Sequence, residues 1–214
     1  MSELALETTL TARRVQKVAK NGILRDAFDL FASLLILAVT WPVLLACAVL
    51  IKLADPQGGV LYTQTRAGLH NKPFRMLKFR SMYVDAEHTG RAVWAQDADT
   101  RVIPVCRFMR RSHLDEMPQL INVLRGEMSL IGPRPERPEI IEDLCKHFPH
   151  YNDRHLIKPG ITGLAQVRQG YDEGLHTVRR KLRYDLLYAR RRTWALDFQI
   201  LFSTIGALRD KRSK

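Results

Sequence analysis

The sequence has few cysteines and a shortage of acidic residues, and both deficits limit the classes of protein to which it can belong. Its three cysteines, Cys47, Cys106 and Cys145, lie far apart and form no CxxC pair. Neither a disulfide framework nor a zinc site is indicated, so a reducing, cytoplasmic setting fits best. The sequence also contains no internal repeat and no low-complexity tract.

The shortage of acids leaves a strongly basic chain. Asp and Glu number 22 against 34 Lys and Arg, so 34 minus 22 gives a formal charge of +12. This balance favours an anionic partner, such as nucleic acid, an acidic lipid surface or a phosphorylated substrate, and does not choose among them. With 214 residues, 46% of them hydrophobic, the chain can build one ordinary domain with a real core, with or without an appendage.

Charge is absent altogether from one stretch, the 22 residues Leu30–Ile51. A helix of this length spans about 30 Å of hydrocarbon, so a single spanning helix or a fully buried soluble helix are the simple interpretations. A signal peptide is not indicated, because the run is too long and starts too far into the chain. However, Pro42 near its middle predicts a kink or break, and the Thr40 hydroxyl can satisfy a freed carbonyl.

The flanks of this run are basic on both sides, so the positive-inside rule gives no orientation for a crossing. A helix that breaks at Pro42 and returns to the same face resolves the conflict. We therefore predict a re-entrant helix-break-helix over residues 25–54. It would follow a basic arm at residues 1–24 and precede a cytoplasmic domain at residues 55–214 with interfacial amphipathic helices.

Residue patterns in the remaining chain predict a mostly helical α+β fold with a small β-hairpin. Val60–Thr65 and Phe74–Ser81 are short strand-like runs joined by a Gly, Asn and Pro connection. Tyr83–Thr100 is polar and predicts a loop. Pro138–Phe148 has a helical apolar face, and the glycine-rich Lys158–Val167 predicts a shaped loop that either approaches a ligand or only turns the chain.

The C-terminal part is helical and intensely basic from Gly174 to Arg192, and an apolar, aromatic stretch follows it. This pattern predicts one or two amphipathic helices on an anionic membrane surface, and a solvated charged helix over a core is the equal alternative. Asp197 is the lone acid in the apolar stretch. It either pairs with one of the nearby arginines or serves a functional site.

Adjacent carboxylates, Asp115 and Glu116, follow an arginine pair that begins at Arg110, and a rigid GPRP segment with Arg134 at its third position comes after them. Cations beside carboxylates are equipped to handle phosphate. The plain alternative is a helix start: Ser112 precedes the acids at capping distance, and apolar residues from Leu114 to Leu124 recur at helical spacing.

Two more cations, Lys78 and Arg80, share a face of the second predicted strand. They predict either a solvated strand face or phosphate binding.

Five blocks in order resemble the bacterial sugar transferases, the monotopic phosphoglycosyl transferases. The blocks are DPQGGVLYTQTRAG, KFRSM, RRSHLDEMPQLINVLRGEMSLIGPRPERPE, PGITGLAQV and YDLLYARRRTWALDFQIL. The resemblance implies transfer of a sugar 1-phosphate from a UDP-sugar to undecaprenyl phosphate at the cytoplasmic face of the bacterial inner membrane. It also implies a role in starting exopolysaccharide or glycoconjugate assembly. Large members carry further domains ahead of this unit, so we expect a minimal catalytic form.

The same resemblance assigns roles to residues. It implies Asp115 as the nucleophile that forms a phosphosugar-enzyme intermediate, Glu116 as the Mg²⁺ ligand, and Pro42 as the membrane break. It also implies site roles for Lys78, Arg110, Arg134 and Asp197, and we add Arg80 as a phosphate contact from its place beside Lys78. A covalent step predicts ping-pong kinetics.

Two rivals come from other classes. A membrane-surface scaffold would tolerate replacement of Glu116, and a nucleic-acid binder would show steeply salt-dependent affinity. The apolar run argues against nucleic acid, and a homodimer is compatible with the sequence. Which sugar is used is not fixed by any motif.

Overall fold

A computed structural model describes residues 22–84, 100–169 and 174–209. The predicted arm at residues 1–24 and the predicted loop at Tyr83–Thr100 both fall mostly outside the described residues. Its helices and strands are, in chain order, α2 Gly22–Ala54, β1 Leu61–Ala67, η1 Leu69–Asn71, β2 Pro73–Phe79, α3 Cys106–Arg111, η2 Leu114–Glu116, α4 Gln119–Leu124, β3 Ser129–Ile131, α5 Pro138–His147, η3 Tyr151–Leu156, β4 Gly160–Thr162, α6 Leu164–Arg168, α7 Leu175–Arg191 and α8 Trp194–Arg209. The predicted mostly helical fold with a small hairpin is confirmed.

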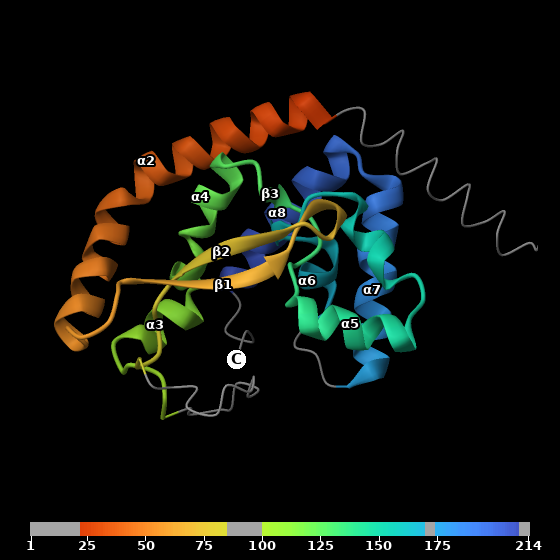
Figure 1. Cartoon of the computed structure of the whole chain (residues 1–214). Helices are drawn as coiled ribbons and strands as arrows, with labels where there is room; N and C mark the ends of the chain where they lie inside the picture. The colour runs from red at the N-terminus through yellow and green to blue at the C-terminus, as the bar shows by residue number, and fades with distance from the viewer. Residues whose placement is uncertain (1–21, 85–99, 170–173, 210–214) are drawn as a thin grey trace, which may run out of the picture.

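The long helix α2 arches over the rest of the domain (Figure 1). Its N-terminal half packs Phe28, Ala32 and Ile36 against a core built from α4, β3, α7 and α8. Its C-terminal half packs Cys47 and Ile51 against β2 and α3. Both halves of α2 therefore contact the same domain.

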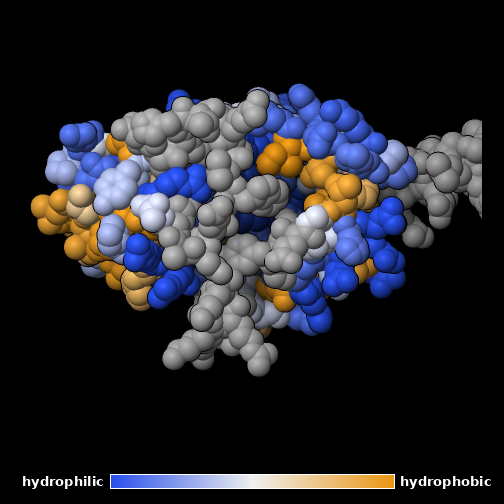
Figure 2. Space-filling model, turned by 90° about the horizontal axis from the view of Figure 1, so that it is seen from below, coloured by the Kyte–Doolittle hydropathy of each residue, from blue (hydrophilic) through white to orange (hydrophobic). Residues whose placement is uncertain are grey.

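The other side of α2 is apolar and exposed. Large hydrophobic side chains stand exposed along its length, among them Ile23, Phe31, Val39, Trp41 and Leu53. Within the described residues α2 is the one helix long and apolar enough to cross a membrane. Seen from below, hydrophobic residues gather at the end of the molecule where Figure 1 places the C-terminal part of α2 (Figure 2).

The break predicted at Pro42 is wrong as a statement about the backbone, because α2 continues through Pro42 as one curved helix (Figure 1). A proline without an N–H leaves the Ala38 carbonyl without its usual partner, and curvature accommodates this loss. The Thr40 hydroxyl donates to the Ile36 carbonyl at 2.7 Å, two residues before the freed carbonyl. Such back-bonding bends helices without ending them. Re-entry of α2 stays a prediction.

The predicted β-hairpin is confirmed. Strands β1 and β2 pair antiparallel, with Leu61 opposite Phe79 and Ala67 opposite Pro73. Only a partial turn at residues 69–71 separates them, and His70 and Asn71 in this turn adopt positive φ. The hairpin carries Lys78 near the end of β2, with Phe74, Met76 and Leu77 buried beside it.

A second sheet was not predicted. Strands β3 and β4 pair in parallel, with Ser129 beside Gly160 and Ile131 beside Thr162. The pair brings the GPRP segment against the glycine-rich loop. A Cβ on Gly160 would lie 2.0 Å from the Gly132 nitrogen, so this close backbone approach requires glycine. The shaped loop thus supports the GPRP segment.

The tail forms two helices. Helix α7 turns its basic side outward, since Arg179, Arg180, Arg183 and Arg190 are exposed, whereas Leu182, Asp185 and Tyr188 are buried. Helix α8 buries Ile200 and Asp197 and exposes Phe198 and Phe202. Their contact with a membrane stays a prediction.

Candidate active site

The two adjacent carboxylates lie in η2, a short 3-10 turn between α3 and α4. The predicted cap is wrong: Ser112 ends α3, and its hydroxyl donates to the Phe108 carbonyl at 2.8 Å. His113 follows in the left-handed conformation, with φ 55, and separates α3 from the acids. Since Pro118 has no N–H, it cannot donate to the Leu114 carbonyl, which instead accepts from the Met117 N–H at 3.2 Å. The turn therefore stays separate from α4.

Glu116 is held by two cations from distant parts of the chain. Arg134 donates to it from the GPRP segment, with Nη2 to Oε1 at 2.5 Å and Nη1 to Oε2 at 3.3 Å. Lys78 donates from β2 to Oε1 at 3.2 Å. Burial alone would raise the pKa of Glu116, but the charges of Arg134 and Lys78 outweigh burial and hold the pKa well below its usual range. Glu116 is ionised throughout the physiological range.

Asp115 has a different environment although it is the next residue. Among the described residues, no hydrogen bond or ion pair involves its carboxylate. Burial and the negative charge of Glu116 raise its pKa, and Lys78, His113 and Arg110 only partly offset this rise. An ionised carboxylate that is desolvated and unpaired is a reactive nucleophile.

Lys78 and Arg110 complete the positive surroundings. Burial lowers the pKa of Lys78 more than the charge of Glu116 raises it, so burial dominates despite the ion pair. Arg110 lies in the last turn of α3, half-buried, and its charge acts on Asp115. The structure thus brings four of the predicted site residues, Lys78, Arg110, Asp115 and Arg134, around Glu116.

Arg80 is not brought to this cluster. It is buried against the turn after α2, where its guanidinium forms an ion pair with Asp55 and donates to the Gly59 carbonyl at 2.6 Å. Strand β2 ends at Phe79, so the alternation that would place Arg80 beside Lys78 ends too. Arg80 fixes the C-terminal end of α2 to the strand that carries Lys78.

Asp197 also has other partners. It is 4% exposed, accepts a hydrogen bond from the Tyr188 hydroxyl at 2.7 Å, and forms an ion pair with Arg25 of α2. Asp197 was expected to pair with a nearby arginine of the tail or to serve the site, but its arginine comes from α2. Arg25 also lies over the Trp194 ring at 4.8 Å. These contacts dock α2 onto α7 and α8.

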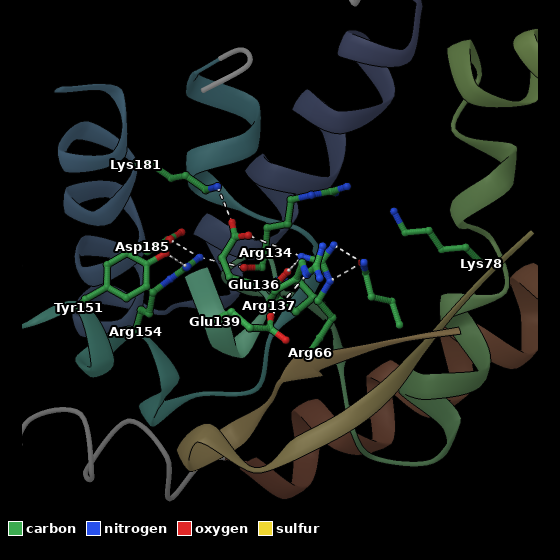
Figure 3. Close-up of polar contacts among 12 residues, drawn as sticks. Arg66, Lys78, Arg134, Glu136, Arg137, Glu139, Tyr151, Arg154, Lys181 and Asp185 are labelled. Carbon is green, nitrogen blue, oxygen red and sulfur yellow. Dashed lines mark hydrogen bonds and ion pairs between the residues drawn. The ribbon is translucent and has the colours of Figure 1, made fainter. Parts of the chain in front are cut away.

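A cluster of charged residues that the sequence did not single out adjoins Arg134 (Figure 3). Glu136 accepts from Lys181 at 2.8 Å and pairs with Arg66 at 3.6 Å. Arg154 is 1% exposed and pairs with Asp185 at 2.7 Å. Asp185 has the same sequence pattern as Asp197, an isolated acid among apolar and basic residues, whereas no pattern in the sequence indicates Arg154.

The acids present fit Mg²⁺ only in a particular way. Within the described ranges, no group of three or more His, Cys, Asp or Glu side chains could hold a metal ion. An all-protein cage is therefore not formed there. Mg²⁺ commonly binds one or two carboxylates together with substrate phosphates and water, and the Glu116 carboxylate fits that mode.

Comparison with known proteins agrees with the five blocks. A family model described as bacterial sugar transferase matches residues 20–211. The chain is 42% identical over 187 residues to the UDP-N-acetylgalactosamine-undecaprenyl-phosphate N-acetylgalactosaminephosphotransferase of Aeromonas hydrophila, covering 87% of this chain and 44% of that protein. It is 42% identical over 200 residues to the UDP-glucose:undecaprenyl-phosphate glucose-1-phosphate transferase of Xanthomonas campestris pv. campestris, covering 89% and 41%.

These two relatives are more than twice as long as the part that the chain matches. The exopolysaccharide production protein PSS of Rhizobium leguminosarum bv. phaseoli is closer in size: 38% identity extends over 191 residues, 86% of this chain and 94% of that protein. The family match covers nearly all of the chain, including both carboxylates and the cations around them. The chain belongs to the bacterial sugar transferase family.

Proposed function

We propose that this protein transfers a sugar 1-phosphate from a UDP-sugar to undecaprenyl phosphate through a covalent intermediate on Asp115. One observation carries the proposal: two adjacent, partly buried acids have opposite charge environments, because Glu116 is paired with Lys78 and Arg134, whereas Asp115 has no ion-pair partner among the described residues. The names of the family relatives supply the substrate class, UDP-sugar and undecaprenyl phosphate.

In the first step, a carboxylate oxygen of Asp115 attacks the phosphorus that bears the sugar. A new oxygen–phosphorus bond forms, the diphosphate bond breaks, and UMP leaves with the electron pair. Lys78, Arg110 and Arg134 hold the phosphate oxygens, since two anions and a carboxylate repel one another without nearby cations. When bound through Glu116 and the diphosphate, Mg²⁺ would supply positive charge at the leaving phosphate.

In the second step, a phosphate oxygen of the lipid attacks the same phosphorus. The bond to Asp115 breaks, the lipid diphosphate sugar forms, and the carboxylate is regenerated. Because the steps are separate, the soluble and lipid substrates need not be bound together, and ping-pong kinetics is expected.

In this proposal, helix α2 holds the protein at the membrane that contains the lipid substrate. Both of its halves pack on one domain, which supports re-entry of α2 into a single leaflet from the cytoplasmic face of the inner membrane. The basic outer side of α7 would lie on anionic headgroups. With the native cysteines replaced, cysteines introduced for Gly22 and Gly59 should both react with a membrane-impermeant maleimide only from the cytoplasmic side. Labelling of the two positions from opposite sides would show a crossing instead.

The proposal is tested by incubating purified enzyme with UDP-glucose or UDP-N-acetylgalactosamine and Mg²⁺, without lipid. We expect UMP release equal to the amount of enzyme, and a phosphosugar mass on the peptide that contains Asp115. The matched control is Asp115→Asn, which should release none and carry no adduct. UMP release that requires the lipid, with no adduct at any time, would exclude the covalent scheme.

A further inference from the structure

Arg134 reaches Glu116 from a segment that has no regular secondary structure, residues 133–137 between β3 and α5. Three successive carbonyls in this segment nevertheless have separate donors. The Arg154 Nη2 donates to the Arg134 carbonyl at 2.9 Å, and Arg66 Nη1 donates to the Pro135 carbonyl at 3.0 Å. The Ala67 N–H donates to the Glu136 carbonyl at 3.0 Å. The path of this segment is therefore set by contacts from outside it.

Arg154 is the most buried of these donors and divides its guanidinium among three partners. Besides the Arg134 carbonyl, it donates to the Tyr151 hydroxyl at 2.7 Å and pairs with the Asp185 carboxylate at 2.7 Å. Burial alone would lower the pKa of Arg154, but Asp185, Tyr151 and Glu136 together outweigh burial and raise the pKa above its usual value. A charge this deeply buried is costly unless several partners satisfy it, so the arrangement has one well-defined geometry.

In Figure 3, Arg134 and Glu136 lie between Arg154 and Asp185 on one side and Lys78, which donates to Glu116, on the other. Arg154 contacts the backbone of residue 134, whereas the Arg134 side chain contacts Glu116. Arg154 thus acts on the acid site through Arg134. Helix α7 contributes twice, with Asp185 holding Arg154 and Lys181 holding Glu136.

We infer that Arg154, held by Asp185, is a positioning residue that aims the Arg134 guanidinium at Glu116 and at the substrate diphosphate. The inference rests on the proposed function for the identity of the diphosphate. A guanidinium recognises phosphate or carboxylate by two parallel hydrogen bonds, so its contribution depends on orientation more than that of a lysine ammonium. Fixing the carbonyl of the same residue fixes the direction in which its side chain starts.

The test is a double-mutant cycle between Arg154→Lys and Arg134→Lys, read as kcat/KM for UMP release. Arg154→Lys keeps the charge beside Asp185 but has no planar fork to reach the carbonyl as well. In the presence of Arg134 we expect Arg154→Lys to lower kcat/KM at least tenfold. In the Arg134→Lys background, adding Arg154→Lys should lower kcat/KM by less than a further threefold, because a flexible ammonium depends little on orientation.

If Arg154 has only a structural role, Arg154→Lys should lower kcat/KM by the same factor in both backgrounds. That result would overturn the inference. Tyr151→Phe is the matched control: it removes one hydrogen bond of Arg154 and leaves the carbonyl contact, so kcat/KM should change less than threefold. Thermal unfolding of every variant sets an assay temperature at which all are folded.

If Arg154→Lys does not fold, Asp185→Asn replaces it in the same cycle, since the amide keeps the shape of the carboxylate. Background-dependent loss supports the inference, and equal loss overturns it. Failure of the proposed function would look different, because wild-type enzyme itself would then release no UMP from any UDP-sugar, or release it only with lipid and without an adduct on Asp115.

Discussion

Ion pairs between carboxylates and basic side chains occur at two places in this molecule and serve different purposes there. At the contact between α2 and the rest of the domain, Asp197 has one arginine, Arg25, and a tyrosine hydroxyl, so charges balance locally. At the acid site, Glu116 has two cations and neighbouring Asp115 has none in the part of the chain that the structure describes. We call Arg25 and Asp197 the balanced set, and the acid site with its cations the unbalanced set. The balanced set holds elements together, whereas the unbalanced set can bind a further anion.

The sharpest test of the unbalanced set is Asp115→Asn. We expect UMP release to fall by about 10⁴-fold or more, which is the order of loss when a nucleophile is removed. The free energy of unfolding should stay equal or rise, because burial and Glu116 disfavour the Asp115 charge in the folded state. Urea unfolding in detergent micelles measures this stability. A large loss of stability with activity per folded molecule preserved would make Asp115 structural.

The counterpart in the balanced set is Asp197→Asn. Removing the charge leaves buried Arg25 without its ion-pair partner, which should lower the free energy of unfolding by about 3 kcal/mol. Activity per folded molecule should change little. Lys158→Met is the control, because its pair with half-exposed Asp26 is worth about 1 kcal/mol at most. If Asp197→Asn is as stable as wild type but inactive, Asp197 belongs to the acid site.

Substitution of Arg80 tests whether this residue serves the acid site or only holds structural elements together. Arg80→Lys loses hydrogen bonds to the carbonyls of Asp55 and Gly59, so we expect a loss of about 1–3 kcal/mol in stability. UMP release per folded molecule should remain within a few fold of wild type. Lys78→Met, two residues earlier, should show the reverse, a large loss of activity with little change in stability. If Arg80→Lys is stable but inactive, the result would support the predicted contact between Arg80 and phosphate.

Sequence patterns predicted the hairpin, the tail helices and the candidate acids because each of these features is local. Alternating and three-to-four spacing reflects contacts within a single element, and turn residues mark its ends. The continuous course of α2 through Pro42 was mispredicted, because the cost of a missing hydrogen bond is small compared with packing along both halves of the helix.

The partners of each charge were the part that sequence could not supply. Lys78 and Arg80 are two residues apart and were expected on one face, yet one meets Glu116 and the other meets Asp55. Their partners are 38 and 25 residues away in the sequence, and the end of β2 at Phe79 separates their directions. The Arg154 contact with the GPRP segment is equally non-local. Such pairings depend on how elements pack, which no periodicity in one element reveals.

The smallest expected effect concerns Arg110, whose charge reaches Asp115 at the edge of the unbalanced set. A nucleophilic Asp115 must be ionised, and its pKa is raised, so UMP release should fall on acidification at a higher pH than for an ordinary aspartate. Arg110 lowers this pKa, so Arg110→Met should move the acid limb of the kcat/KM profile to still higher pH. Arg107→Met, one turn earlier and exposed, should leave the limb in place. An acid limb that is the same in Arg110→Met and wild type would mean that Arg110 does not tune the nucleophile, and the unbalanced set would then comprise only Lys78 and Arg134.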